Sequence, residues 1–209
     1  MMIDFKALQE SVEKDKTTTY CIVSGDKSFI EQKFLFLPVG DVVTAVSAKD
    51  VLFRACDILL KNQVGMGRSI VIMTSDNNGV DSMAVSYSTE RNYDCIIVPT
   101  DWDGLGKRAG YLKNEEIMYQ AGRRRHKAAI LFWDGEDVMT RNLMYQAFCM
   151  GVPCRVYNYV DKKWLTQPEI SDIQKDERYK ALNWRKNKDD GGVQELPNTD
   201  SPDAVSDAN

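Results

Sequence analysis

The pattern of apolar residues constrains the fold of this 209-residue chain more than any other feature of its sequence. Five short apolar runs are separated by longer segments in which apolar residues recur at helical spacing. The runs cover residues 20–23, 70–73, 95–99, 128–132 and 154–157. Strands that are apolar throughout and alternate with amphipathic helices are typical of a parallel sheet covered by helices on both faces. We therefore expect an α/β protein with a mainly parallel, five-stranded sheet in the strand order 3-2-1-4-5.

The segments outside these runs indicate how the chain is organised. Residues 34–46 are apolar but are interrupted by Pro38 and by Gly40 and Asp41, which predicts a small inserted hairpin. Ser47 followed by Asp50 predicts the start of the first long helix. We expect an N-terminal helical extension over 1–19, a three-layer Rossmann-like domain over 20–160 and a C-terminal extension over 161–188.

Charge is distributed unevenly along the chain. Residues 189–209 contain six acidic residues and no Lys or Arg, whereas the net charge of the whole chain is only −4. The same stretch has almost no large apolar side chains, so it cannot bury enough surface to offset the entropy lost on ordering. We therefore predict a disordered acidic tail on a body that carries a small net positive charge.

Composition excludes several classes of protein. No apolar run approaches the roughly 18 residues that a membrane-spanning helix needs, so no membrane partner is expected. The N-terminus lacks the apolar core of a secretory signal, which predicts a cytoplasmic location. His126 is the only histidine, and the five cysteines show no Cys-x-x-Cys spacing. Histidine-rich metal sites and Ser-His catalytic pairs are thereby excluded, and no metal or cofactor is expected.

Polar segments that contain glycine follow the predicted strands. In an open parallel sheet such segments meet at the carboxyl edge, which is where these sheets bind ligands. The residues after the first strand are Gly25, Asp26 and Lys27, and those after the second are Asn78, Gly79 and Asp81. The residues after the third strand are Asp101, Trp102, Ala109, Gly110, Lys113 and Asn114, and those after the fourth are Trp133, Asp134, Gly135 and Thr140. We expect all of them to line one ligand-binding pocket.

Several of these residues have an ordinary structural alternative. Asp81 either contacts a ribose hydroxyl or only lies near the positive end of a helix. Asp134 either contacts the ligand or anchors the neighbouring backbone, and Trp102 either stacks on a base or packs beside its loop. Lys113 and Asn114 fall at the start of a helix predicted over 114–121, where the helix dipole favours a phosphate. The alternative for Lys113 is a solvated surface lysine.

The order of the loops resembles that of the SLOG superfamily of Rossmann-like proteins, and most closely its YspA-like branch. The matching segments are SGDKSF at 24–29, DNNGVD at 76–81, TDW at 100–102, AGYLKN at 109–114 and FWDG at 132–135 with Thr140. Lys27 and Lys113 stand where the branch usually has arginine, which replaces a two-pronged donor by a point charge. Leu143 stands where the related LOG phosphoribohydrolases carry a catalytic glutamate.

The resemblance implies a small nucleotide or nucleotide-derived ligand of the ADP-ribose or NAD type. The protein would bind it as a sensor or a sequestering module and would self-associate as a homo-oligomer. The base would lie against Trp102 or Trp133. The phosphates would lie on Gly25, Lys27, Gly110 and Lys113. An alternative is a nucleotide N-glycosidase of the LOG type in which Asp134 or Asp101 replaces the missing glutamate.

A second alternative is single-stranded nucleic-acid binding of the DprA type. The run RRRHK at 123–127 would supply the positive charge, but it lies between a helix end and the fourth strand, on the edge opposite the predicted pocket. The helix dipole alone favours cations at a helix C-terminus. We therefore do not expect nucleic acid as a partner. A compact chain of this kind would also suit a phage source.

Overall fold

The computed structural model describes residues 13–36, 44–106 and 108–176, and the predicted acidic tail at 189–209 lies outside them. Its centre is a six-stranded sheet with the strand order β5-β4-β1-β6-β7-β8. The strands are β1 (Thr18–Gly25), β4 (Ser69–Ser75), β5 (Asp94–Val98), β6 (His126–Trp133), β7 (Cys154–Asn158) and β8 (Lys163–Trp164). All neighbouring pairs in this sheet are parallel except β7 and β8. The chain therefore has the mostly parallel α/β architecture that the alternating pattern predicts.

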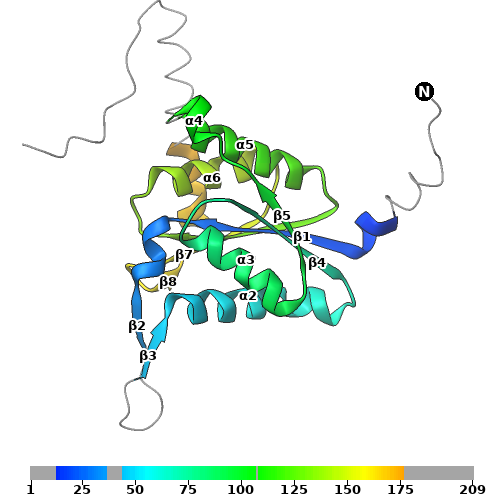
Figure 1. Cartoon of the computed structure of the whole chain (residues 1–209), viewed down its shortest axis with the longest axis horizontal. Coiled ribbons are helices and arrows are strands. Elements are labelled where there is room, and N and C mark those ends of the chain that lie inside the picture. The colour runs from blue at the N-terminus through cyan, green and yellow to red at the C-terminus, as the bar shows by residue number, and fades with distance from the viewer. Residues whose placement is uncertain (1–12, 37–43, 107, 177–209) are drawn as a thin grey trace, which may run out of the picture.

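Helices cover both faces of the sheet, as Figure 1 shows. One face carries α2 (Ala48–Gly65) and α3 (Val80–Arg91), and the other carries α5 (Arg108–Gly122) and α6 (Val138–Cys149). Each face has its own apolar core, built from alternate residues of the same strands. Ile22 of β1 belongs to the core beneath α5 and α6, whereas Cys21 and Val23 belong to the core beneath α2 and α3. Because successive side chains of a strand point to opposite faces, the position of a residue at a strand end decides which pair of helices its side chain faces.

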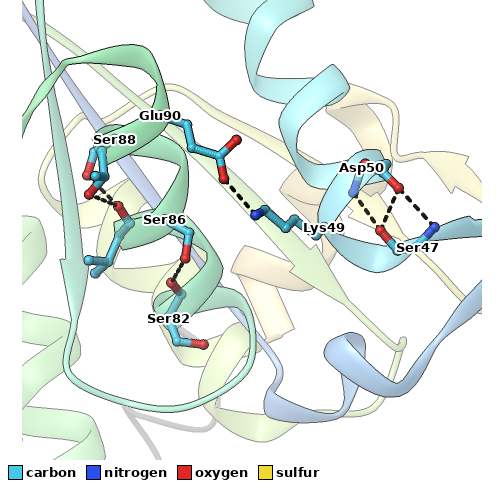
Figure 2. Close-up of polar contacts among 9 residues, drawn as sticks. Ser47, Lys49, Asp50, Ser82, Ser86, Ser88 and Glu90 are labelled. Carbon is cyan, nitrogen blue, oxygen red and sulfur yellow. Dashed lines mark hydrogen bonds and ion pairs between the residues drawn. The ribbon is translucent and has the colours of Figure 1, made fainter.

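Local sequence signals set the ends of α2 and α3. Ser47 caps α2 as predicted: its side chain accepts a hydrogen bond from Asp50 N, and the Asp50 carboxylate accepts one from Ser47 N. Lys49 reaches from α2 to Glu90 on α3, with 2.6 Å between Nζ and Oε1, and Figure 2 shows both contacts. Asn92 ends α3 in the left-handed conformation that commonly terminates a helix.

The inserted hairpin predicted over 34–46 is confirmed. β2 (Lys33–Phe36) and β3 (Thr44–Ser47) pair in antiparallel fashion, and the residues that join them, 37–43, lie outside the described part of the chain. A short 3-10 helix, η1 (Lys27–Glu31), connects β1 to this hairpin. The hairpin then leads directly into α2, because Ser47 is both the last residue of β3 and the cap of the helix.

The sheet differs from the expected one in its strand count. We predicted five strands, but β8 adds a sixth beside β7 through antiparallel pairing of Tyr157 with Trp164. The order 3-2-1-4-5 therefore describes only part of a six-stranded sheet. β8 and a helical segment at 167–176 form the described part of the predicted C-terminal extension, and Ile170 of this segment is buried in the core beneath α5 and α6.

The helix after the third predicted strand begins earlier than expected. We predicted 114–121, whereas α5 spans Arg108–Gly122 and a short helix, α4 (Trp102–Leu105), precedes it. Gly110 inside α5 lies against the Met139 side chain of α6, where an added Cβ would come within 2.9 Å of the sulfur and the methionine would have to shift. Lys113 and Asn114 therefore lie in the second turn of α5, and the prediction that they mark a helix start is wrong.

Candidate functional site

Several buried polar side chains meet at the carboxyl edge of the sheet. Asp81, in the first turn of α3, is only 2% exposed and accepts hydrogen bonds from serines at the ends of two strands. Ser24 Oγ of β1 donates to Asp81 Oδ1 at 2.6 Å, and Ser75 Oγ of β4 donates to Oδ2. Asn77 in turn donates to Ser75 Oγ through its side-chain amide at 2.9 Å. Asp81 thus ties two adjacent strands to α3.

Lys113 of α5 is a buried ammonium beside these groups, with an exposed fraction of only 8%. Burial lowers the pKa of Lys113 because the charged form loses hydration, while the carboxylates of Asp81, Asp137 and Asp76 act in the opposite direction. No hydrogen bond or ion pair joins its Nζ to any residue that the structure describes. The alternative of a solvated surface lysine is therefore wrong.

Three further buried polar atoms at this edge have no hydrogen-bond partner within the described part of the chain. They are the hydroxyl of Thr100, which follows β5, the side-chain oxygen Oδ1 of Asn114 in α5 and the hydroxyl of Thr140 in α6. Most buried polar atoms in proteins are paired, so each unpaired atom requires an explanation. Unpaired atoms gathered at the edge where parallel sheets bind ligands mark a candidate binding site.

These residues are linked to Lys113 through two of its carboxylate neighbours, Asp76 and Asp137, and through α6. The backbone amide of Thr100 donates to Asp76 at 3.0 Å, and that of Thr140 donates to Asp137 at 2.6 Å. Asn114 Nδ2 donates to the Met139 carbonyl oxygen at 2.9 Å. We call this group the Lys113 cluster, and it consists of Asp76, Asp81, Thr100, Lys113, Asn114, Asp137 and Thr140.

Trp102 forms a wall beside the Lys113 cluster. Its side chain is 47% exposed, and its indole Nε1 donates to Asn77 Oδ1 at 3.1 Å. The ring lies close to Gly110, where an added Cβ would be 3.4 Å from the ring atom Cη2. An open hollow of about 650 Å³ lies between the end of β5 and α5, and Ala109 and Lys113 are among the residues that line it. Lys113 is therefore reached from outside through this hollow.

The turn after β1 is engaged in contacts within the protein. Gly25 packs so closely on β6 that a Cβ would come within 2.1 Å of the Phe132 carbonyl oxygen. Asp26 caps η1 through Ser28 N and also accepts hydrogen bonds from the hydroxyls of Ser28 and Tyr159. Burial by itself raises the pKa of Asp26, but the hydrogen bonds from Tyr159 and Ser28 outweigh it and lower the pKa below its ordinary value.

The loop after β4 rests against this turn through Gly79. The φ of 83° and ψ of −128° at Gly79 lie in a region that essentially only glycine adopts. An added Cβ would also come within 2.4 Å of Lys27 Cα. Lys27 and Asn78 are exposed on either side of this contact. Close approach of two loops therefore explains the glycine.

The segment after β6 is held mainly by internal contacts. Trp133 is 5% exposed, belongs to the core and donates through Nε1 to the Asp137 carbonyl oxygen at 3.0 Å, so its predicted role as a wall for a base is wrong. Asp134 Oδ1 accepts hydrogen bonds from the backbone amides of Glu136 at 2.7 Å and Asp137 at 2.6 Å. These contacts match the alternative in which Asp134 anchors backbone. Gly135 has a φ of 104°, which accounts for glycine in this turn.

The structure brings only some of the predicted residues together. Asp81, Lys113, Asn114 and Thr140 belong to the Lys113 cluster, and Trp102, Ala109 and Gly110 lie beside it. Asp101 caps α4 by accepting a hydrogen bond from Gly104 N at 2.8 Å. The carboxylates of Asp26 and Asp134 instead interact electrostatically with the hydroxyl of Tyr159, which follows β7.

Several residues of this edge were not predicted from the sequence. Asp76 and Thr100 fall within the segments that resemble the SLOG loops but were not predicted as site residues, and Ser75 is a single serine of a kind common at strand ends. Asp137 stands three residues before Thr140, and this spacing is typical of a helix cap, so it could have been found. Nothing in the sequence distinguishes Tyr159 from other tyrosines of the chain.

The basic run at 123–127 lies at the opposite edge, where β6 begins at His126. The Arg124 guanidinium lies over the ring of Tyr20, 4.5 Å from its centroid, and 3.8 Å from the Asp15 carboxylate. Part of the positive charge of this run is therefore engaged within the protein, away from the Lys113 cluster.

Comparisons with protein-family models, with curated proteins and with solved structures gave no match to this chain. Membership of the SLOG superfamily and self-association therefore stay predictions. Among the described residues, none of the helices combines the length and apolar character needed to cross a bilayer. Within the same residues, no group of three or more His, Cys, Asp or Glu side chains is placed to hold a metal ion.

Proposed function

We propose that this protein binds a small nucleotide or nucleotide-derived molecule at the carboxyl edge of its parallel sheet, as a sensor or a sequestering module. The observation that carries the proposal is the Lys113 cluster, in which a buried ammonium and three buried polar atoms have no hydrogen-bond partner among the described residues. Leaving such groups unpaired is costly, and a polar ligand that enters beside Lys113 and reaches them would supply their partners.

The position of the cluster supports this class of ligand. Its members come from the loop after β4, the residues that follow β5, the first turn of α3, the second turn of α5 and the start of α6, at the edge where open parallel sheets bind nucleotides. Trp102 is half exposed and held by Asn77, so it offers a fixed aromatic face on which a base can stack. The resemblance of the loops to the SLOG superfamily supports the same assignment.

The contacts favour binding over hydrolysis of a glycosidic bond. The two carboxylates considered as catalytic, Asp134 and Asp101, both accept hydrogen bonds from backbone amides of their own loops. Leu143, which stands in place of the glutamate of the LOG enzymes, is 1% exposed and belongs to the core. The hydrolase alternative therefore depends on the resemblance alone.

Mass spectrometry of small molecules that co-purify with the full-length protein tests the proposal. We expect a nucleotide-derived compound to be retained by the wild type and lost from Lys113→Met. Lys61→Met, which changes an exposed lysine of α2, is the matched control and should retain the compound. The proposal fails if no such compound co-purifies and added nucleosides and nucleotides leave the thermal midpoint unchanged.

Incubation of the same protein with nucleoside monophosphates separates binding from turnover. We expect no release of free base. Release of base that is abolished by Asp134→Asn would establish the hydrolase alternative in place of a sensor or sequestering module.

A further inference from the structure

We infer that the part of the ligand that contacts the Lys113 cluster is an uncharged, hydroxyl-bearing group, such as the ribose of a nucleoside, and not a phosphate. The inference rests on the proposed function, because it concerns the ligand of the same site. It follows from the charge around Lys113, from the chemistry of the unpaired atoms and from the aspartates at the nearby helix starts.

Lys113 provides one positive charge among three carboxylates. Its ammonium interacts electrostatically with the carboxylates of Asp81, Asp137 and Asp76, and Asp81 is itself buried. A phosphate at this place would add negative charge where carboxylates already outnumber the ammonium. Asp81 and Lys113 are buried, so little water screens the repulsion between Asp81 and a phosphate, whereas Asp76 is exposed and Asp137 is half-buried. An uncharged group avoids this repulsion and can still accept a hydrogen bond from Lys113.

The unpaired side-chain oxygen of Asn114 requires a donor. Asn114 Nδ2 already donates to the Met139 carbonyl oxygen at 2.9 Å and to Asn142 Oδ1 at 3.1 Å, which fixes the orientation of the amide and leaves Oδ1 unpaired. An amide oxygen can accept hydrogen bonds but cannot donate them, and the same holds for the oxygens of an ionised phosphate. A phosphate therefore cannot pair with Asn114 Oδ1. A sugar hydroxyl can donate to Asn114 and accept from Lys113 at the same time. The two unpaired threonine hydroxyls can each donate a hydrogen bond to such a group or accept one from it.

Aspartates lie at the starts of η1, α3, α4 and α6, where backbone amides would otherwise attract a phosphate, whereas α5 has no acidic residue in its first turn. Asp26 caps η1, Asp101 caps α4 and Asp137 caps α6, and each accepts a hydrogen bond from an amide of the first turn. Asp81 lies in the first turn of α3. An anionic ligand would have to compete with these carboxylates, whereas a nucleoside would not.

Isothermal titration calorimetry with the full-length protein distinguishes the two kinds of ligand. The probes are the common ribonucleosides and their 5′-mono-, di- and triphosphates, all at one ionic strength. We expect the nucleoside of the preferred base to bind at least about tenfold more tightly than its triphosphate, with affinity falling at each added phosphate. A di- or triphosphate that binds more tightly than its nucleoside would overturn the inference and leave the proposed function standing. If no probe binds, both fail.

The 2′,3′-dideoxynucleoside of the same base tests the contact with ribose. It lacks the hydroxyls that would pair with the cluster, so we expect it to bind roughly threefold to tenfold more weakly than the ribonucleoside. Equal affinity of the two compounds would overturn the assignment of ribose to the Lys113 cluster.

Thr140→Val and Thr74→Val form a matched pair of variants. Thr140 Oγ1 is unpaired, so its removal should weaken nucleoside binding by roughly threefold to tenfold without lowering the thermal midpoint. Thr74 Oγ1 donates to the Val23 carbonyl oxygen at 2.9 Å, so its removal should lower the midpoint and leave nucleoside affinity unchanged. Wild-type affinity in Thr140→Val would count against the inferred contact.

Discussion

Ser24 at the end of β1 and Asp81 at the start of α3 are joined by a hydrogen bond of 2.6 Å between Ser24 Oγ and Asp81 Oδ1. Ser75, at the end of β4, donates to the other oxygen of the same carboxylate. The two serines reach one acceptor because β1 and β4 are adjacent and parallel. A single buried carboxylate thereby fixes two strand ends next to Lys113 and supports the candidate site from within.

Asp81→Asn is expected to lower the free energy of unfolding by about 1.5–3 kcal/mol, the usual contribution of hydrogen bonds to a charged group. Asparagine keeps the shape of aspartate but offers one acceptor oxygen to the two serine hydroxyls. Urea denaturation at neutral pH measures the loss. Asp103→Asn, at an exposed position of α4, is the control and should change stability by less than about 0.5 kcal/mol. Similar values for the two variants would contradict the structural role of Asp81.

Gly79→Ala should destabilise the fold by about 2 kcal/mol or more, since a residue with a Cβ is strained at this φ and ψ and would overlap the Lys27 backbone. Gly65→Ala, at the end of α2, is the matched control because a Cβ there meets nothing within 4 Å. Alanine favours the helical conformation, so the control should be neutral or slightly stabilising. Chemical denaturation of both variants measures the difference, and a stable Gly79→Ala would show that the two loops can move apart.

Apolar runs predicted the parallel strands because a strand buried on both faces has few polar residues, as in β4. The same reasoning could not find β8, since Lys163 and Trp164 form neither a run nor an alternation and pair only because the chain turns back beside β7. The start of α5 was missed for a related reason. Glycine normally weakens a helix, so the sequence around Gly110 did not indicate one, and the Met139 side chain packed against Gly110 becomes apparent only in the structure.

The candidate site could be predicted only in part. The position of loops after strands indicated Asp81, Lys113, Asn114 and Thr140, because parallel strands place these loops on one edge. The partners of Asp81 depend on which strands are neighbours and could not be inferred from spacing. Trp133 was misassigned because a fully apolar strand does not reveal which face its last residue occupies, and that face here is the core beneath α5 and α6.

Glu169 should titrate well below an ordinary glutamate. A hydrogen bond from the Thr166 amide, with further contacts from Lys163 and the Thr166 hydroxyl, lowers the pKa of Glu169 from 4.5 to about 2. Because the folded pKa lies below the unfolded one, this contact stabilises the protein above about pH 4.5 and the stabilisation is lost as the pH falls toward 2. NMR titration of the Glu169 side chain measures the pKa, and Glu169→Gln should flatten the fall in stability across this window. A pKa near 4.5 would contradict these contacts.

Lys113 should lose its proton at a lower pH than an ordinary lysine. Desolvation lowers the pKa of its ammonium below 10.5, although three nearby carboxylates oppose the shift. The NMR signal of Lys113 Cε as a function of pH measures this directly, and a pKa of 10.5 or above would contradict the burial of the charge. Saturation with a bound nucleoside should raise the pKa again, because a ligand hydroxyl that accepts from the ammonium favours its charged form.

The same shift has a defined consequence for stability. Between the folded pKa of Lys113 and 10.5, the unfolded chain binds more protons than the folded one, so Lys113 makes the free energy of unfolding rise with pH in this window. Lys113→Met lacks the group, and the stability of the wild type relative to this variant should therefore increase as the pH approaches 10.5. Chemical denaturation of both proteins at a series of pH values measures the difference. If that difference does not vary with pH in this window, the lysine is not desolvated in the folded protein, and the buried ammonium that carries the proposed function is not present.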